Sequence, residues 1–197
     1  MKLFFISIIA SIIVAAINIR PIENSNPVHK IINDTTMVND TFKKPTVVLE
    51  TVFVNPMTVL FISDTAADMN SISKIFANDY GELFTFINQS GLKPMKVMAF
   101  YLSYENPLTL EAAVEIDKLT ATLTGRIKSK IVEGGNAVVG HYTGPYEEME
   151  MPYKTIIQWV KDNNKQAKGL PFEVYLNSPD TVKDKYDLKT DIYQLLQ

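Results

Sequence analysis

One carboxylate stands out in this chain because its sequence neighbours are apolar or aromatic. Glu173 lies in the segment LPFEVYLNSP, which has the composition of a strand. Side chains of a strand alternate between its two faces, so Phe172, Val174 and Leu176 share one face and Glu173 and Tyr175 the other. We expect the apolar face to pack under helices, which leaves Glu173 and Tyr175 on the opposite face.

A carboxylate among aromatic rings has a definite chemistry. It attracts a lipophilic cation by Coulomb and cation–π terms, the latter worth about 0.5–2 kcal/mol per ring. Burial raises the pKa of such a carboxylate, and a proton or a ligand relieves the cost. The structural alternative is a solvated glutamate, or one paired with Lys96 or Lys189 on a neighbouring strand. The residues alone leave both interpretations of Glu173 open.

Further aromatic side chains could line a pocket around this carboxylate. Tyr142 and Tyr146 flank a Gly144-Pro145 turn. The other candidates are Tyr101, Tyr104, Tyr153, Trp159 and Tyr193. Each of them is equally well explained as an ordinary core or edge-strand residue, so the pocket assignment depends on how the fold brings them together.

Composition and motifs exclude several classes of function. The chain is 46% hydrophobic and 21% charged, which is typical of a globular protein. A net charge of −3 without a basic stretch argues against a nucleic-acid partner. The absence of cysteine excludes disulfides and zinc–thiolate sites, and two histidines, His29 and His141, are too few for an all-protein transition-metal site. No nucleophile elbow, phosphate loop or dinucleotide fingerprint occurs, so no metal or cofactor is predicted.

The N-terminal region predicts a membrane-directing segment and a tether. Residues 3–19 form the apolar run LFFISIIASIIVAAINI. This run is at the short limit of a spanning helix, about 17–25 residues, and longer than a signal-peptide core of about 7–15. We expect residues 1–20 to be a transmembrane anchor or a signal peptide, and residues 21–45 a flexible tether. The rest of the chain would then be membrane-anchored outside the cytoplasm, or secreted or periplasmic after cleavage.

Residues 46–197 predict one domain built from two β-α-β-β repeats, at about 46–118 and 124–197. In the first repeat, Asn55-Pro56 bends or divides the opening strand and Gly91 ends a helix of about twenty residues. In the second, we expect either a short first turn and a kink or a main helix that begins near Pro152, because an interior proline costs about 3 kcal/mol. Aligning the repeats places Ala99 opposite Glu173.

The duplication predicts an α+β fold. Two such units form one antiparallel sheet with both helices on one face and a ligand cleft at the pseudo-twofold seam between them. Only the second copy contributes a carboxylate to this seam.

Residues 138–197 resemble a known family. The sequences GHYTGPYEEMEMPYKTIIQWV and GLPFEVYLNSPD, followed by a closing TDIY strand, are similar to the GyrI-like small-molecule-binding domain, also called the AraC-type or bacterial transcription activator effector-binding domain. The resemblance weakens back to about residue 52. It implies a cleft between two β-α-β-β units, amphipathic ligands that are often cationic or aromatic, a cleft glutamate corresponding to Glu173, and aromatic neighbours at Tyr142, Tyr153 and Tyr175. A subset of the family hydrolyses strained electrophiles with such a glutamate and a tyrosine.

Three hypotheses follow. The first is a tethered or secreted module that binds small lipophilic molecules, cationic or aromatic, through Glu173 and the aromatics Tyr101, Tyr142, Tyr146, Tyr153, Trp159 and Tyr175. The second is a hydrolase in which Glu173 is the general base and Tyr142 or Tyr175 positions the electrophile. The third is a protein-interaction module that uses the cleft face against another polypeptide. Loss of a partner on substitution of exposed helix residues such as Glu147 and Lys161, with small-molecule binding intact, would identify it.

Overall fold

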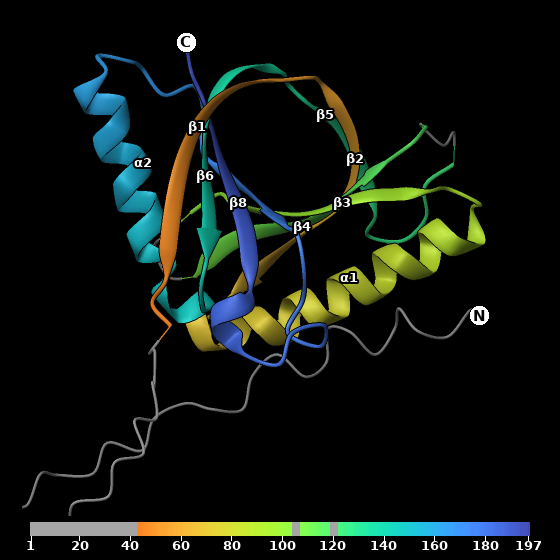
Figure 1. The fold of residues 1–197 in the computed structure, drawn as a ribbon. Coiled ribbons are helices and arrows are strands. Elements are labelled where there is room, and N and C mark those ends of the chain that lie inside the picture. The colour runs from red at the N-terminus through yellow and green to blue at the C-terminus, as the bar shows by residue number, and fades with distance from the viewer. Residues whose placement is uncertain (1–42, 104–106, 119–121) are drawn as a thin grey trace, which may run out of the picture.

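The computed structural model describes residues 43–103, 107–118 and 122–197. In these ranges, strands alternate with helices along the chain and pair antiparallel in one eight-stranded sheet of order β1-β6-β8-β7-β3-β4-β2-β5 (Figure 1). The strands are β1 (Thr46–Val54), β2 (Met57–Ala66), β3 (Pro94–Tyr101), β4 (Leu108–Ile116), β5 (Lys128–Val132), β6 (Gly135–Thr143), β7 (Phe172–Tyr175) and β8 (Lys189–Leu195). The helices are α1 (Ile72–Gln89) and α2 (Glu150–Asp162), with short 3₁₀ turns at Met69–Ser71, Tyr146–Glu148 and Lys185–Asp187.

The sheet contains the predicted duplication. One unit is β2-α1-β3-β4 and the other is β6-α2-β7-β8, and they meet where β3 pairs with β7, a contact that we call the seam. Ala99 faces Glu173 at the centre of the seam, and these are the residues that the repeat alignment makes equivalent. In the same alignment Met98 corresponds to Phe172, and Phe100 corresponds to Val174. Exchanging the two units therefore turns the Met98–Val174 pair on one side of the centre into the Phe100–Phe172 pair on the other. A pseudo-twofold axis therefore passes through the Ala99–Glu173 pair.

The outermost strands are exchanged between the two units. β1 precedes the first unit in sequence but pairs with β6 of the second, and β5 precedes the second unit but pairs with β2 of the first. The two connections cross at Gly134, where an added Cβ would lie 2.4 Å from the carbonyl oxygen of Val54 and 2.7 Å from Cδ of Pro56. Pro56 divides β1 from β2 at the position expected for a residue that cannot donate inside a strand.

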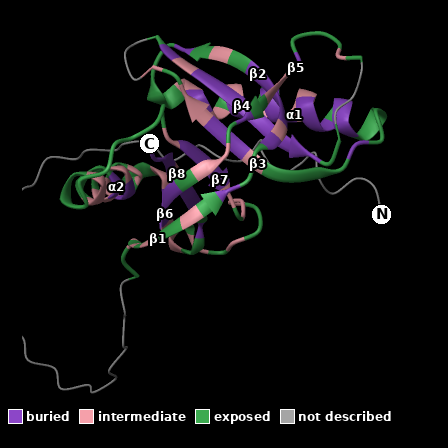
Figure 2. Cartoon of the chain, turned by 90° about the horizontal axis from the view of Figure 1, so that it is seen from above, coloured by how far each residue is buried: buried purple, intermediate pink, exposed green. Residues whose placement is uncertain are grey.

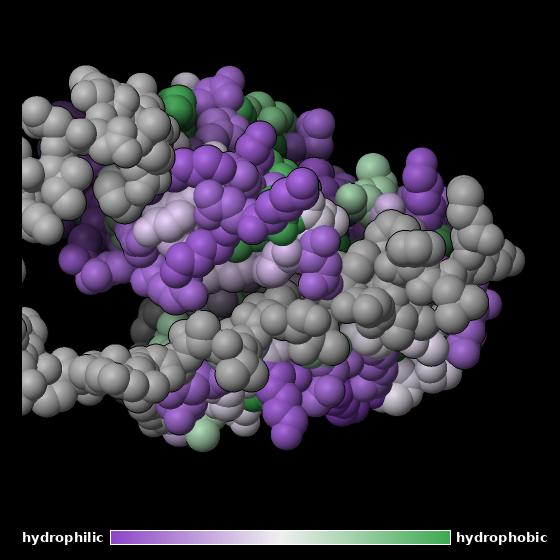
Figure 3. All heavy atoms as spheres, turned by 60° about the horizontal axis from the view of Figure 1, so that its bottom comes forward, coloured by the Kyte–Doolittle hydropathy of each residue, from purple (hydrophilic) through white to green (hydrophobic). Residues whose placement is uncertain are grey.

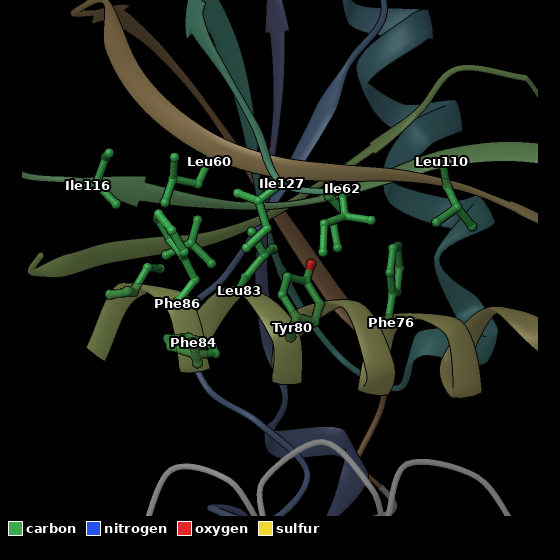
Figure 4. Packing of buried hydrophobic residues seen from close by; sticks show 14 of the residues in the cluster. Leu60, Ile62, Phe76, Tyr80, Leu83, Phe84, Phe86, Leu110, Ile116 and Ile127 are labelled. Carbon is green, nitrogen blue, oxygen red and sulfur yellow. The ribbon is translucent and has the colours of Figure 1, made fainter. Parts of the chain in front are cut away.

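Both helices cover the same face of the sheet, as predicted. Facing residues of neighbouring strands share a side, and the row that includes Ala112, Ala99 and Ile192 lies under the helices. In the larger cluster, Phe76, Tyr80 and Leu83 of α1 pack against β2 and β4 (Figure 4). The smaller cluster joins α2 to β6 and β8. Buried residues accordingly follow the central strands, whereas much of α2 is exposed (Figure 2).

The face away from the helices is also buried over part of its area, and here one expectation was wrong. Phe172 and Val174 do not lie under the helices but in an apolar cluster on the other face, with Val59, Phe61 and Met98. The strands bend round this face (Figure 1), and the side chains that point into the bend form this cluster. Because both faces bury apolar groups, alternation within β7 could not show which of them the helices cover.

The ends of both helices follow local rules. Asp68 accepts a hydrogen bond from the Ser71 amide at 3.0 Å and caps the 3₁₀ turn that leads into α1. α2 begins at Glu150, which places Pro152 in its first turn, where no intrahelical N–H bond is lost. In the view of Figure 3, the coloured surface is mostly hydrophilic, with hydrophobic groups in small areas between polar ones.

The expected membrane segment, residues 3–19, and most of the expected tether lie outside the described residues. Within the ranges that are described, neither helix is long and apolar enough to cross a bilayer.

Candidate functional site

Glu173 is held by two tyrosines in the middle of the seam. The residue is only 4% exposed. The hydroxyl of Tyr153 donates a hydrogen bond to its Oε1 at 2.7 Å, and the hydroxyl of Tyr175 donates to its Oε2 at 2.7 Å. Each carboxylate oxygen thus has one phenolic donor, which fixes the plane of the carboxylate.

The two tyrosines reach Glu173 from different elements. Tyr175 is two residues further along β7 and so lies on the same face of the sheet. Tyr153 lies in the first turn of α2, next to Pro152. Because an α2 residue contacts Glu173, the carboxylate lies on the helical face, opposite to where alternation alone had placed it.

An aromatic wall extends from Glu173 to both helices. Tyr146, just before α2, meets Tyr175 edge-on with ring centres 5.8 Å apart. From α1, Tyr80 donates its hydroxyl to the Met98 carbonyl at 2.6 Å and points toward the sheet (Figure 4). Phe76 of α1 lies between Tyr80 and Tyr101: its ring centre is 5.5 Å from that of Tyr80 and 6.1 Å from that of Tyr101.

Burial and the carboxylate act together on the ionisable groups of this site. Burial raises the pKa of Glu173, and the hydrogen bonds from Tyr175 and Tyr153 only partly offset this rise. Burial also raises the pKa of Tyr80, Tyr146 and Tyr175, and the Glu173 charge adds to the rise in each case. A negative charge at Glu173 is therefore unfavourably placed until a proton or a cation joins it.

The predicted alternative of a lysine partner does not describe this carboxylate. Lys96 pairs with Glu115 at 2.7 Å on the other face of the sheet. Among the residues that the structure describes, no lysine, arginine or histidine forms an ion pair with Glu173.

Two of the predicted site residues lie elsewhere. Tyr142 is fully buried in the α2 cluster, where its hydroxyl donates to the Pro145 carbonyl at 2.9 Å and burial raises its pKa to about 12. Trp159 packs, half-buried, against the same cluster from the far part of α2. Of the other candidates, Tyr193 stacks on Phe172 on the opposite face, and Tyr104 lies outside the described residues.

Sequence reasoning missed the contribution of α1. Phe76 and Tyr80 are four residues apart and therefore share one face of the helix. That spacing is the signal that the sequence offers, but it is equally typical of two residues in an ordinary hydrophobic core. His141 lies in β6, between Asp191 and Glu50 on the non-helical face. In the described part of the chain, no three acidic or histidine side chains gather as a metal site.

Comparison with known proteins decides the family. Residues 50–196 match the model of the GyrI-like small molecule binding domain. This chain belongs to the GyrI-like family. A comparison with curated protein sequences gives no significant match.

Solved structures share the GyrI-like fold at low sequence identity. The EcmrR protein in a cryo-electron-microscopy complex with DNA aligns with a TM-score of 0.66 and 17% identity, over 81% of this chain and 60% of that one. A Listeria innocua protein described as a hydrolase has a TM-score of 0.57 and 16% identity, over 79% and 92% of the two chains. SAV2435 bound to tetraphenylphosphonium has a TM-score of 0.50 and 9% identity, over 76% and 93%. At these identities the likeness shows the fold alone, and the chain spans less than two thirds of EcmrR.

Proposed function

We propose that this domain binds small lipophilic cations at the seam, with Glu173 as the counter-charge. The observation that carries the proposal is a carboxylate only 4% exposed whose oxygens, among the described residues, accept hydrogen bonds from neutral phenols alone. A buried carboxylate without a cationic side chain is costly, and a bound cation offsets that cost.

The surrounding aromatic rings favour an organic cation over a simple inorganic cation. Tyr146 and Tyr175 present one aromatic wall and Tyr80 and Tyr101 another, from the two units. Aromatic faces and edges suit a ligand whose charge is spread over an apolar body. The tetraphenylphosphonium that SAV2435 binds is a ligand of this class.

Titration of the full chain with tetraphenylphosphonium tests the proposal. We expect saturable binding that Glu173→Gln weakens at least tenfold, about 1.4 kcal/mol. The matched control is Glu115→Gln, which removes another buried carboxylate on the opposite face and should leave affinity unchanged. Neutral triphenylphosphine oxide should bind more weakly than the cation. Equal binding by wild type and Glu173→Gln, with both folded by circular dichroism, would reject the counter-charge role.

A hydrolase is the second candidate, and one observation favours it. Glu173 is next to two tyrosine hydroxyls, a base beside groups that could orient an electrophile. The Listeria innocua neighbour described as a hydrolase has the same fold. Incubation with styrene oxide separates the candidates: diol formation lost in Glu173→Gln supports an enzyme, whereas binding of tetraphenylphosphonium without any turnover supports a binding module.

We also propose that residues 3–19 tether the domain to a membrane or direct its export, with the domain outside the cytoplasm. The support is the apolar run followed by a polar segment. Cell fractionation with intact-mass analysis tests this: an uncleaved chain in membranes indicates an anchor, a shortened soluble chain indicates a signal peptide, and a full-length soluble chain rejects both.

A further inference from the structure

A cleft separate from the seam lies at the C-terminal end of α2, away from Glu173. Its volume is about 500 Å³, within the range of about 300–1,000 Å³ typical of small-molecule sites. It is lined by Thr51, Val52, Phe53, Asn136, Ala137, Trp159, Asn163, Lys165, Leu196 and Gln197. None of the residues that surround Glu173 takes part. In Figure 1 this is the upper end of α2, near the C-terminus and β1.

The walls of this cleft are fixed by backbone hydrogen bonds. The Leu196 amide donates to the Asn136 carbonyl at 2.8 Å, which ties the end of the chain to β6. The Lys165 amide donates to the Val160 carbonyl at 3.0 Å, and Asn163 Nδ2 donates to the Trp159 carbonyl at 2.9 Å. The turn that ends α2 therefore holds Trp159 and Lys165 at one rim, so little ordering cost remains for a ligand.

The lining combines an apolar floor with one positive charge. Leu196 is buried and Trp159 half-buried, both in the cluster under α2, and Phe53 is exposed at the rim, whereas the side chains of Val52 and Ala137 pack on the other face of the sheet. Lys165 is the single charged side chain of the lining, and it is exposed. Within the described ranges, no side-chain or terminal carboxylate forms an ion pair with it, whereas nearby Lys168 pairs with Glu133 at 2.7 Å.

We propose that this cleft binds small amphipathic anions. The aromatic or aliphatic body of the ligand lies against Trp159 and Phe53, and its carboxylate or sulfonate pairs with Lys165. The amides of Asn136 and Asn163 lie at the same cleft and supply further polar contacts. The charge preference is the reverse of that at Glu173, so the two sites of one domain select ligands of opposite sign.

Trp159 is the single tryptophan of the chain, so its fluorescence reports on this cleft directly. The probe is 8-anilinonaphthalene-1-sulfonate, added to the full chain. We expect saturable quenching of Trp159 emission with energy transfer to the probe. Lys165→Gln should weaken binding at least fivefold, whereas Lys161→Gln, on the same helix end but outside the lining, should not. Neutral N-phenyl-1-naphthylamine should bind more weakly than the sulfonate.

The seam site supplies the remaining control. Glu173→Gln should leave sulfonate binding unchanged, and tetraphenylphosphonium should not compete. Failure of cation binding at Glu173 would leave this result standing, because the two readouts use different sites. The inference is overturned if quenching does not saturate, if Lys161→Gln and Lys165→Gln act alike, if the neutral analogue binds equally well, or if binding is lost in Glu173→Gln.

Discussion

Burial and two phenols act in opposite directions on the charge state of Glu173. Burial raises the pKa of this carboxyl group, while Tyr175 and Tyr153 stabilise the ionised form by donating to it. The proposed cation binding requires the ionised form, so affinity should fall as the pH drops through the raised pKa, at a higher pH than for an exposed glutamate.

Tyr153→Phe should move this pH dependence upward. The substitution removes one of the two donors that favour the carboxylate, so the pKa of Glu173 rises further and cation affinity is lost at a higher pH. Tyr193→Phe, on the opposite face, is the control and should leave the midpoint in place. Equilibrium dialysis of tetraphenylphosphonium from about pH 4 to about pH 8 measures both midpoints. A midpoint that stays fixed or moves down in Tyr153→Phe would contradict the assigned role.

At the scale of elements, β1 is an edge strand, and a histidine of the next strand connects it to the strand beyond. β1 pairs with β6 alone, and His141 of β6 contacts strands on both sides. Its Nδ1 is 2.8 Å from Asp191 Oδ1 of β8, and its Nε2 is 3.2 Å from Glu50 Oε2 of β1. Burial disfavours the charged ring, but hydrogen bonds to both carboxylates outweigh this and raise the pKa of His141. The Tyr193 hydroxyl, a further titratable group, donates to the other oxygen of Asp191, Oδ2, at 3.5 Å.

His141→Gln should therefore destabilise the fold in a pH-dependent way. Because the folded-state pKa is raised above 6.5, the contribution of the charged ring is full below about pH 6.5 and is lost as pH rises through the folded pKa. The difference in unfolding free energy between wild type and variant should shrink from about pH 6 to about pH 9, measured by urea denaturation. Lys154→Gln, which removes an exposed helix pair with Glu150, should show a small difference that does not vary over this range. A His141→Gln difference that grows with pH would refute the linkage.

At the scale of the whole molecule, the exchanged strands make the two units interdependent. The outermost strand of each half of the sheet reaches it through the crossing at Gly134. β1, which precedes the first unit, completes the second by pairing with β6, and β5, which precedes the second unit, completes the first by pairing with β2. Neither half retains its full sheet without the other, so the domain should unfold in one cooperative transition despite its duplicated sequence.

Gly134→Ala tests the crossing. The new Cβ would meet the Val54 carbonyl and the Pro56 ring well inside contact distance, so we expect a loss of about 1–3 kcal/mol in unfolding free energy with a single transition retained. Gly81→Ala is the control: nothing lies within 4 Å of the added Cβ, and alanine favours the helix, so a gain of about 0.5–1 kcal/mol is expected. Thermal and urea unfolding of both variants give the comparison, and two separate transitions in the wild type would disprove interdependence.

The sequence predicted the fold more fully than the site. The β-α-β-β duplication, the division at Pro56 and the start of α2 near Pro152 follow from local rules, and the structure confirms them. The face occupied by Glu173 could not be predicted, because Phe172 and Val174 fill a second buried layer. The exchange of β1 and β5 was also beyond reach, since local pattern fixes a strand but not its partner.

The axis through Ala99 and Glu173 has a consequence for the polarity of the seam. If both copies carried glutamate, two carboxylates would face each other across neighbouring strands, with Cα atoms about 4.5–5.5 Å apart. Like charges at that range share a proton, and the centre would hold an acid dyad. With alanine on one side, a methyl group faces a single carboxylate. Each unit contributes aromatic side chains to the seam. Because the two repeats differ at this one position, the aromatic side chains of both units surround a single carboxylate.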